Sequence, residues 1–121
     1  MKHLVKGRKL SREKGQREAL LNGLIANLVL NEKIVTTEAK AKELKPLMDK
    51  IITKVKKSSM DKQKKVSAIR DLKKDLNDDC VKKLFGELIK KFEGRTSGYT
   101  RILKLSPRKS DSAKMAVIEF V

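Results

Sequence analysis

The sequence predicts a single α+β domain spanning residues 1–121, in which one helix, one strand, three helices and two strands follow one another. Three observations lead to this fold class. Four stretches carry apolar residues at the i, i+3, i+4, i+7 spacing of a half-buried helix. Three shorter runs are β-branched or alternate between apolar and polar residues, as strands do. A chain of 121 residues can bury about two thirds of the surface that it exposes when unfolded, which suits one domain.

The first thirty residues join a basic arm to the first helix. Residues 1–17 hold seven basic residues and one acid, Glu13, so we expect residues 1–10 to form a flexible arm when the protein is free. Ser11 is the expected N-cap of the helix, with Glu13 in its first turn, and the helix should end near Leu30. Its apolar face consists of Leu21, Leu24, Ile25 and Leu28.

A short strand and a long helix should follow. Residues 34–37 are β-branched and predict the strand, after which Thr37 can cap the next helix with Glu38 in its first turn. The apolar stripe of this helix consists of Ala41, Leu44, Met48, Ile51, Ile52 and Val55. Pro46 interrupts the stripe and should kink the helix at a cost of about 3 kcal/mol. The alternative is a pair of short helices that meet at Lys45.

Residues 56–65 are polar and basic and predict an exposed connection, with Ser59 or Asp61 starting a third helix. The apolar stripe of that helix is narrow and consists of Val66, Ile69, Leu72 and Leu76. The rest of the helix is charged, so it should rest on the core while presenting lysines to a partner.

The fourth helix has the strongest apolar stripe of the chain, formed by Val81, Leu84, Phe85, Leu88, Ile89 and Phe92. Asn77 or Asp78 should cap its start, and Gly94 should end it in the left-handed conformation. Asp78 and Asp79 could form a catalytic pair, but adjacent acids at a helix start are far more often cap and dipole partners.

Two strands should close the chain as a hairpin, Tyr99–Leu105 and Lys114–Val121, with Pro107 in the turn between them. Together with residues 34–37 they predict a small three-stranded sheet covered on one face by helices. Alternation places Tyr99, Arg101, Leu103 and Leu105 on one face of the first of these strands, and Ala116, Ile118 and Phe120 on one face of the second. A cluster of helices with a frayed hairpin is the alternative.

The charge of the chain indicates a polyanionic partner. Thirty-one basic residues against fifteen acidic ones leave a net charge of +16, which is concentrated in residues 1–17, 54–74 and 90–109. A surplus of this size repels itself in a compact monomer unless a polyanion neutralises it, so nucleic acid is the leading partner. The alternative reading is a lysine-rich surface that serves solubility. Seven residues are arginines, and all but Arg70 lie near the two ends of the chain, where we expect ordered phosphate contacts.

The sequence shows no signal of catalysis, a cofactor or a metal. It has no phosphate-binding glycine loop and no metal-ligand spacing, and Cys80 is its single cysteine, which excludes an intrachain disulfide. The longest uncharged apolar run, 24–30, is far too short for a membrane span, and no secretory signal is visible, so we expect an intracellular protein. Two alternatives are a histone-like DNA-bending protein, although no wedge-bearing basic hairpin stands out, and an enzyme acting on RNA, although no general base stands out.

Four segments resemble one known family. They are the opening MKHLVKGRKLSR, IVTTEAKAK at 34–42, KLFGEL at 83–88 and SGYTRILK at 97–104. In this order they resemble the bacterial large-subunit ribosomal protein seventeen family, across nearly the whole chain. The resemblance implies the same order of elements and a structural constituent of the cytoplasmic ribosome that is not an enzyme. It also implies binding to folded large-subunit ribosomal RNA on the solvent side, near the exit of the peptide tunnel.

The implied partners are large-subunit ribosomal RNA and neighbouring large-subunit proteins, with no membrane, small-molecule substrate or cofactor. Phe85, Phe92 and Phe120 occupy core-type positions, which leaves Tyr99 free to stack, so recognition of the backbone and shape of RNA is favoured over base stacking. The candidate RNA-binding residues are Lys2, His3, Lys6, Arg8, Lys9, Arg12, Lys14, Arg17, Lys40, Lys42, Arg95, Tyr99, Thr100, Arg101, Lys104, Arg108 and Lys109.

Overall fold

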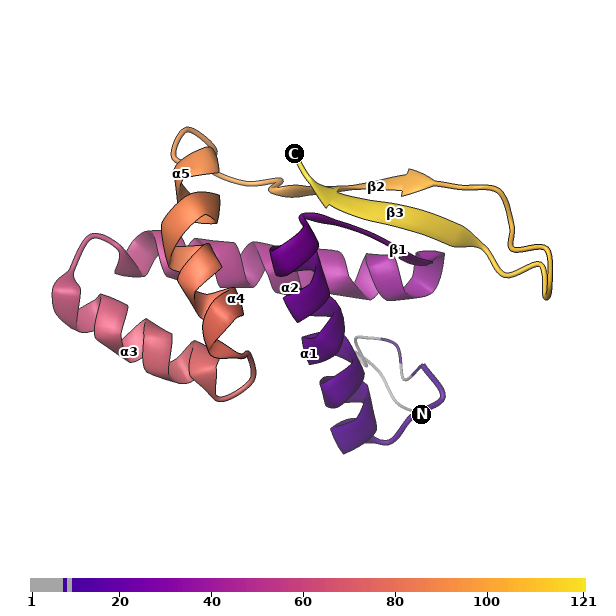
Figure 1. Ribbon diagram of the computed structural model, residues 1–121, viewed down its shortest axis with the longest axis horizontal. Helices are drawn as coiled ribbons and strands as arrows, with labels where there is room; N and C mark the ends of the chain where they lie inside the picture. Colours follow the sequence, from indigo (N-terminus) through magenta and orange to yellow (C-terminus); the bar gives the residue numbers. More distant parts are fainter. Residues whose placement is uncertain (1–7, 9) are drawn as a thin grey trace, which may run out of the picture.

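A long central helix supports both a sheet and a set of shorter helices (Figure 1). The computed structural model describes Arg8 and residues 10–121. In chain order the elements are α1 (Lys14–Asn31), β1 (Lys33–Thr37), α2 (Glu38–Ser58), α3 (Lys62–Lys73), α4 (Asp78–Lys83), the π-helical turn η1 (Leu84–Leu88), α5 (Ile89–Lys91), β2 (Thr100–Lys104) and β3 (Met115–Phe120). Because α4, η1 and α5 form one continuous helix, this order confirms the predicted α+β class and its succession of elements. The predicted arm, residues 1–10, falls almost entirely outside the described residues.

The start of α1 differs from the prediction. Leu10 and Ser11 have φ angles of 54° and 56°, in the left-handed region, so the chain turns before the helix begins. Glu13 is the N-cap, with an extended backbone and no side-chain capping bond. The prediction that Ser11 caps the helix is therefore wrong, as is the placement of Glu13 in the first turn. At the other end Glu32 adopts φ 64°, and its N–H donates to the carbonyl of Leu28 at 2.7 Å, which closes the helix.

Helix α2 begins as predicted and runs without interruption past its proline. The Thr37 hydroxyl accepts a hydrogen bond from the backbone N–H of Lys40 at 3.4 Å, and Glu38 lies in the first turn. The helix continues through Pro46, whose ring is exposed. The alternative of two helices meeting at Lys45 is wrong, since burial of one face of α2 offsets the loss of one backbone donor.

Helix α3 begins at Asp61, whose side chain accepts from the N–H of Gln63 at 3.0 Å, as one of the two alternatives predicted. The connection is shorter than the predicted 56–65, because α2 extends to Ser58. The predicted packing stripe is partly wrong: Val66 is half exposed, whereas Ala68 and Leu72 are buried. The small side chain of Ala68 allows α3 to pack against α2.

The fourth helix starts at Asn77, whose side chain accepts from the N–H of Cys80 at 3.0 Å. The π-helical turn η1 adds a residue to one turn, so the stripe rotates along the helix. Its buried members are Val81, Leu84, Leu88 and Phe92, while Phe85 and Ile89 are partly buried. The helix ends at Lys91, with Phe92 as its C-cap, rather than at Gly94. Among the glycines described the positive φ belongs to Gly98, so the predicted left-handed end at Gly94 is wrong.

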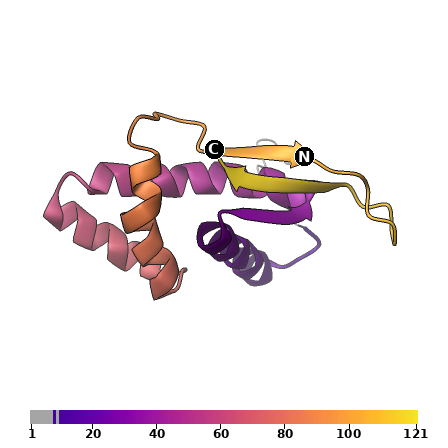
Figure 2. The ribbon, with the colours of Figure 1, turned by 45° about the horizontal axis from the view of Figure 1, so that its top comes forward.

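The sheet is antiparallel and has the order β1-β3-β2, which places the last strand in its centre. Val117 of β3 lies opposite Val35 of β1 and Leu103 of β2. Helices cover one face only: α2 packs against all three strands and α1 lies beside β1 (Figure 2). Because β1 pairs with β3, the alternative of a frayed two-stranded hairpin is wrong.

The aromatic residues join the sheet to the helices. Phe92 is fully buried, with its ring 5.2 Å from that of Tyr99 in an edge-on arrangement and 5.7 Å from that of Phe120. On the covered face of β3, Ala116 and Ile118 are fully buried. These contacts place the core between α2, the fourth helix and the inner face of the sheet.

Candidate nucleic-acid interface

Basic side chains from three parts of the chain meet at the N-terminal end of α2. Arg8, Lys42 and Lys114, with Thr37, Glu38, Ala39 and Ala113, line a hollow of about 320 Å³. The Arg8 guanidinium lies 3.1 Å from a carboxylate oxygen of Glu43, one turn into α2 from this hollow. The fold therefore brings the end of the arm, the first turns of α2 and the start of β3 to one surface.

Glu38 is the acidic centre of this surface. Its carboxylate lies 2.9 Å from the ammonium of Lys42 and 3.8 Å from that of Lys104. The hydrogen bond from Lys42 lowers the pKa of Glu38, and the charges of Lys42, Lys104 and Lys114 lower it further against the opposing effect of burial. Glu38 is therefore ionised, and its single negative charge is surrounded by the positive charges of Lys42, Lys104 and Lys114. We call Arg8, Lys42, Lys104 and Lys114 the hairpin-side cluster.

The loop between β2 and β3 projects beyond this cluster and is held by one acid (Figure 1). Arg108 makes a two-pronged contact with Asp111, Nε to Oδ1 at 2.9 Å and Nη2 to Oδ2 at 2.6 Å. The backbone N–H of Ala113 also donates to Asp111, at 3.1 Å. The Arg108 hydrogen bonds lower the pKa of Asp111 to about 2, and the bond from Ala113 adds to the effect. Lys109, between these residues, is exposed.

Two of the candidate residues are turned inward. Tyr99 and Thr100 are each 2% exposed, so the expectation that Tyr99 is free to stack is wrong, and the Thr100 side chain has no free surface either. Tyr99 precedes β2 and is drawn into the core by Phe92, and its hydroxyl donates to the carbonyl of Arg95 at 3.4 Å. Lys56 donates to the same carbonyl, with its ammonium 5.3 Å from the centre of the Tyr99 ring. These contacts hold the loop before β2 on the core.

The other candidates are spread over several surfaces. Arg101 pairs with Glu119 at 2.6 Å on the uncovered face of the sheet, and Arg95 donates to the Gly98 carbonyl at 3.3 Å at the far end of β2. Arg12 donates to the Leu10 carbonyl at 2.6 Å. Lys14 is exposed, whereas Arg17 and Lys40 are half-buried. Lys2, His3, Lys6 and Lys9 lie outside the described residues. The candidates thus do not form one continuous site.

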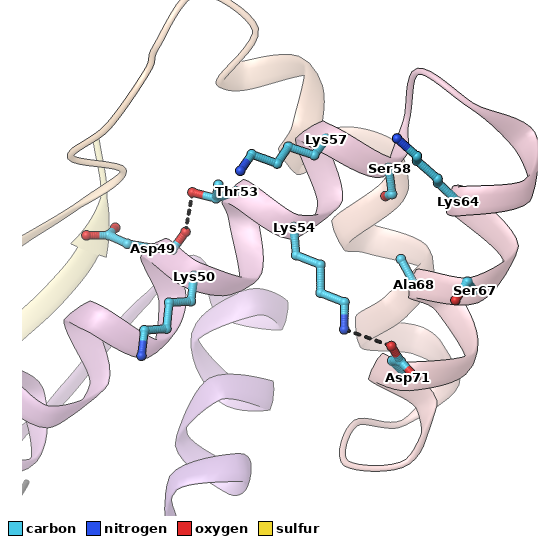
Figure 3. A pocket seen from close by; sticks show the side chains of 10 residues that line it. All are labelled: Asp49, Lys50, Thr53, Lys54, Lys57, Ser58, Lys64, Ser67, Ala68 and Asp71. Atoms are coloured by element: carbon cyan, nitrogen blue, oxygen red, sulfur yellow. Dashed lines mark hydrogen bonds and ion pairs between the residues drawn. The ribbon is translucent and has the colours of Figure 1, made fainter.

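A basic groove between α2 and α3 contains none of the candidate residues (Figure 3). It has a volume of about 680 Å³, and its lysines are Lys50, Lys54, Lys57 and Lys64. The signal was present in the sequence, since Lys50, Lys54 and Lys57 recur at i, i+4, i+7 and the basic block 54–74 contains the last two of them and Lys64. Lys114 was also missed, because nothing in the sequence shows that the start of β3 faces Glu38.

Some kinds of site are lacking in the part of the chain that the structure describes. Over Arg8 and residues 10–121, no group of three or more His, Cys, Asp and Glu residues is placed to hold a metal ion. None of the helices over the same residues is long and apolar enough to cross a membrane. Cys80 is fully buried, and this burial raises the pKa of its thiol.

Comparison with known proteins decides the family. Residues 20–121 match the family model described as ribosomal protein L17. The chain belongs to the ribosomal protein L17 family. It is therefore a structural ribosomal protein and not an enzyme, as the sequence predicted.

Curated relatives of this L17-family chain align with almost all of it, and each is named large ribosomal subunit protein bL17. The relative from Shouchella clausii is 46% identical over 116 residues, covering 93% of this chain and 97% of its own length. The relative from Lactococcus lactis subsp. cremoris (strain MG1363) is 44% identical, covering 97% of this chain and 100% of its own. The relative from Chlorobium luteolum is 47% identical and covers 100% of this chain, the basic arm included, but 67% of its own length.

Proposed function

We propose that this L17-family chain is a structural constituent of the large subunit of the bacterial, cytoplasmic ribosome and that it binds and stabilises folded large-subunit ribosomal RNA. The names of its relatives support its place in the large subunit. One observation carries the proposal of RNA binding: the hairpin-side cluster gathers four basic side chains from distant parts of the chain beside two acids, Glu38 and Glu43. A surface of this kind neutralises backbone phosphates and displaces their counterions.

The recognition is of the RNA backbone and shape. Tyr99 and Phe92 are buried, and Phe85 and Phe120 are partly buried, so no fully exposed aromatic ring is available for base stacking among the residues that the structure describes. Folded RNA presents phosphates and 2′-hydroxyls at its surface, and exposed ammonium and guanidinium groups suit both.

The proposed contacts fall into two groups. In the first group each cation is already paired with an acid and exchanges it for a phosphate: Arg8, Lys42, Arg101, Lys104 and Arg108. The second group consists of the remaining candidates, Arg12, Lys14, Arg17, Lys40, Arg95 and Lys109, with Lys2, His3, Lys6 and Lys9 of the arm. Lys114, which lines the hollow beside Glu38, joins the second group, whereas Tyr99 and Thr100 are buried and support this region from within.

We further propose a place on the solvent side of the subunit, near the exit of the peptide tunnel, with other large-subunit proteins as neighbours. The place rests on the family resemblance of the four sequence segments. The neighbours are supported by the uncovered face of the sheet, where Val35 is 60% exposed and Leu103 is 48% exposed, on either side of Val117. Apolar side chains that adjoin on an open face mark a protein contact.

Binding to a large-subunit ribosomal RNA transcript tests the function. The variant Arg8→Gln/Lys42→Gln/Lys104→Gln removes three cations of the hairpin-side cluster. It should bind the transcript roughly 10- to 100-fold more weakly, with a salt slope smaller by about 2 to 3 units. The control Lys33→Gln/Lys82→Gln/Lys90→Gln removes equal charge from exposed lysines of β1, α4 and α5 that lie outside the candidate sites. Equal weakening of both variants, or equal binding of the wild type to duplex DNA, would refute the proposal.

A further inference from the structure

The groove between α2 and α3 is lined by more basic than acidic side chains: Lys50, Lys54 and Lys57 of α2 and Lys64 of α3, against Asp49 and Asp71. Lys50, Thr53, Lys54 and Lys57 form a stripe at i, i+3, i+4, i+7 on α2, and Lys64, Ser67, Ala68 and Asp71 form the same stripe on α3. Residues at this spacing share one helix face. Lys54 and Asp71 point toward each other across the groove, whereas the side chains of Lys50 and Lys57 extend away from α3 (Figure 3). The buried methyl group of Ala68 forms part of the floor.

The charges inside the groove remain available to a ligand. Asp71 is held by Lys54, whose ammonium lies 3.1 Å away across the groove, and this hydrogen bond lowers the pKa of Asp71. Over Arg8 and residues 10–121, no carboxylate lies within 4.0 Å of the ammonium groups of Lys50, Lys57 or Lys64. All three are exposed. The hairpin-side cluster differs, because Glu38 and Glu43 occupy most of its cations.

We propose that this groove is a second RNA site, which binds backbone phosphates of a double-stranded segment through Lys50, Lys57 and Lys64. The proposal rests on the proposed function, because the RNA that reaches the groove is the one that the protein binds in the subunit. Lys54 and Asp71 form a bridge between the two helices that keeps the groove in shape. The hydroxyl of Ser67, which is exposed on the α3 wall, is a further donor to phosphate or 2′-hydroxyl oxygens.

The distance between the groove and the hairpin-side cluster indicates what a second RNA site would do. Glu38, the centre of the hairpin-side cluster, and Lys54, in the middle of the groove, are both residues of α2 and lie about 24 Å apart along its axis, at about 1.5 Å per residue. One rigid helix thus carries two cationic surfaces that are separated by more than two Debye lengths at about 0.15 M salt. The protein therefore contacts two RNA segments and fixes the distance between them.

The test compares the groove variant Lys50→Gln/Lys57→Gln/Lys64→Gln with the control Lys33→Gln/Lys82→Gln/Lys90→Gln. Both remove three exposed positive charges, and the groove variant leaves the pair of Lys54 and Asp71 intact. Glutamine is about as good a helix former as lysine, and Lys33, the one substituted residue in a strand, is exposed, so thermal melting should be the same for both. Binding to a large-subunit ribosomal RNA transcript and to an unrelated RNA duplex is then measured across a range of salt concentrations.

The groove variant should bind the ribosomal transcript roughly 10- to 100-fold more weakly than the control variant, with a salt slope lower by about 2 to 3 units. If the wild type binds the transcript and the two variants bind equally well, the groove is not an RNA site, although the proposed function stands. If the wild type does not prefer the transcript to the unrelated duplex, the proposed function fails. In that case the groove is tested on the unrelated duplex. Weaker binding of the groove variant than of the control variant supports the site, and equal binding of the two variants overturns it.

Discussion

Single acidic residues organise the cations of this protein. Glu38, Glu43, Glu119 and Asp111 each hold a basic side chain that was a candidate for RNA binding. An exposed ion pair of this kind adds little stability, because both partners are well hydrated when they are apart. It does restrict the rotamers of long side chains before RNA arrives, which lowers the entropy lost on binding.

The pair of Arg108 and Asp111 offers a test by titration. The pKa of Asp111 is about 2 in the folded protein and should be about 3.9 in the unfolded chain. Since the folded value is the lower one, the pair stabilises the fold fully above pH about 4, and this stabilisation is lost as the pH falls toward about 2. In Arg108→Ala the pKa should rise toward the unfolded value, but not reach it, because the N–H of Ala113 still donates. Carboxyl NMR titration measures it, and an unchanged pKa would contradict the assigned cause.

Phe92 and Phe85 lie on the same helix, but Phe92 is in the core and Phe85 is at its border. Phe92 is fully buried against Tyr99 and Phe120, so Phe92→Ala should lower the free energy of unfolding by about 3 to 5 kcal/mol. Phe85 is partly buried, so Phe85→Ala should cost clearly less. Denaturant titration of the two variants provides the comparison, and an equal loss would mean that the π-helical turn does not rotate the stripe as described.

At the scale of elements, local sequence signals predicted most of the fold. Thr37, Asp61 and Asn77 cap helices because a short oxygen-bearing side chain can accept from a backbone N–H near the helix start. The misses have long-range causes. Tyr99 is buried because Phe92 lies over it, and the π-helical turn at residues 84–88 changes the phase of a stripe that looks regular in the sequence.

The candidate site was less predictable than the fold. The exposed arginines and lysines near the chain ends could be listed from charge alone. Some of their acidic partners are local, such as Asp111 for Arg108, but others come from distant elements. Lys104 reaches Glu38 of α2 from the end of β2, and Lys114 lines the same hollow from the start of β3. The groove depends on how α3 packs against α2, which a narrow stripe did not specify, since Val66 is exposed and Ala68 is buried.

The continuity of α2 leads to a prediction about Pro46. This residue lies in the interior of the helix with its ring exposed, so it removes one backbone hydrogen bond without contributing to the core. Pro46→Ala should raise the free energy of unfolding by about 1 to 2 kcal/mol, which is less than the full helix penalty because proline also restricts the unfolded chain. Pro107→Ala, in the exposed β2–β3 loop, is the control and should change stability little. A loss of stability in Pro46→Ala would show that α2 requires its proline.

At the scale of the whole molecule, excess positive charge destabilises the compact state of the free protein. Thirty-one basic residues share the chain with fifteen acidic ones, and the two proposed RNA surfaces lie along the same helix. Mutual repulsion of these cations opposes the compact state, and RNA removes that repulsion as it binds. Folding stability and RNA affinity should therefore respond to salt in opposite directions.

Melting of the free protein tests this balance. Raising the ionic strength from about 0.01 M to about 0.15 M shortens the Debye length from about 30 Å to about 8 Å, which screens repulsion between the two surfaces. The exposed ion pairs also weaken, but repulsive pairs outnumber them at a net charge of +16, so the melting temperature should rise. The rise should be roughly 3 to 5 °C for each kcal/mol of repulsion screened. Lys50→Gln/Lys57→Gln/Lys64→Gln carries three fewer charges and should start from a higher melting temperature at low salt and gain less from added salt. A melting temperature that falls with salt in the wild type would mean that attractive pairs dominate and that the free protein is not strained by its charge.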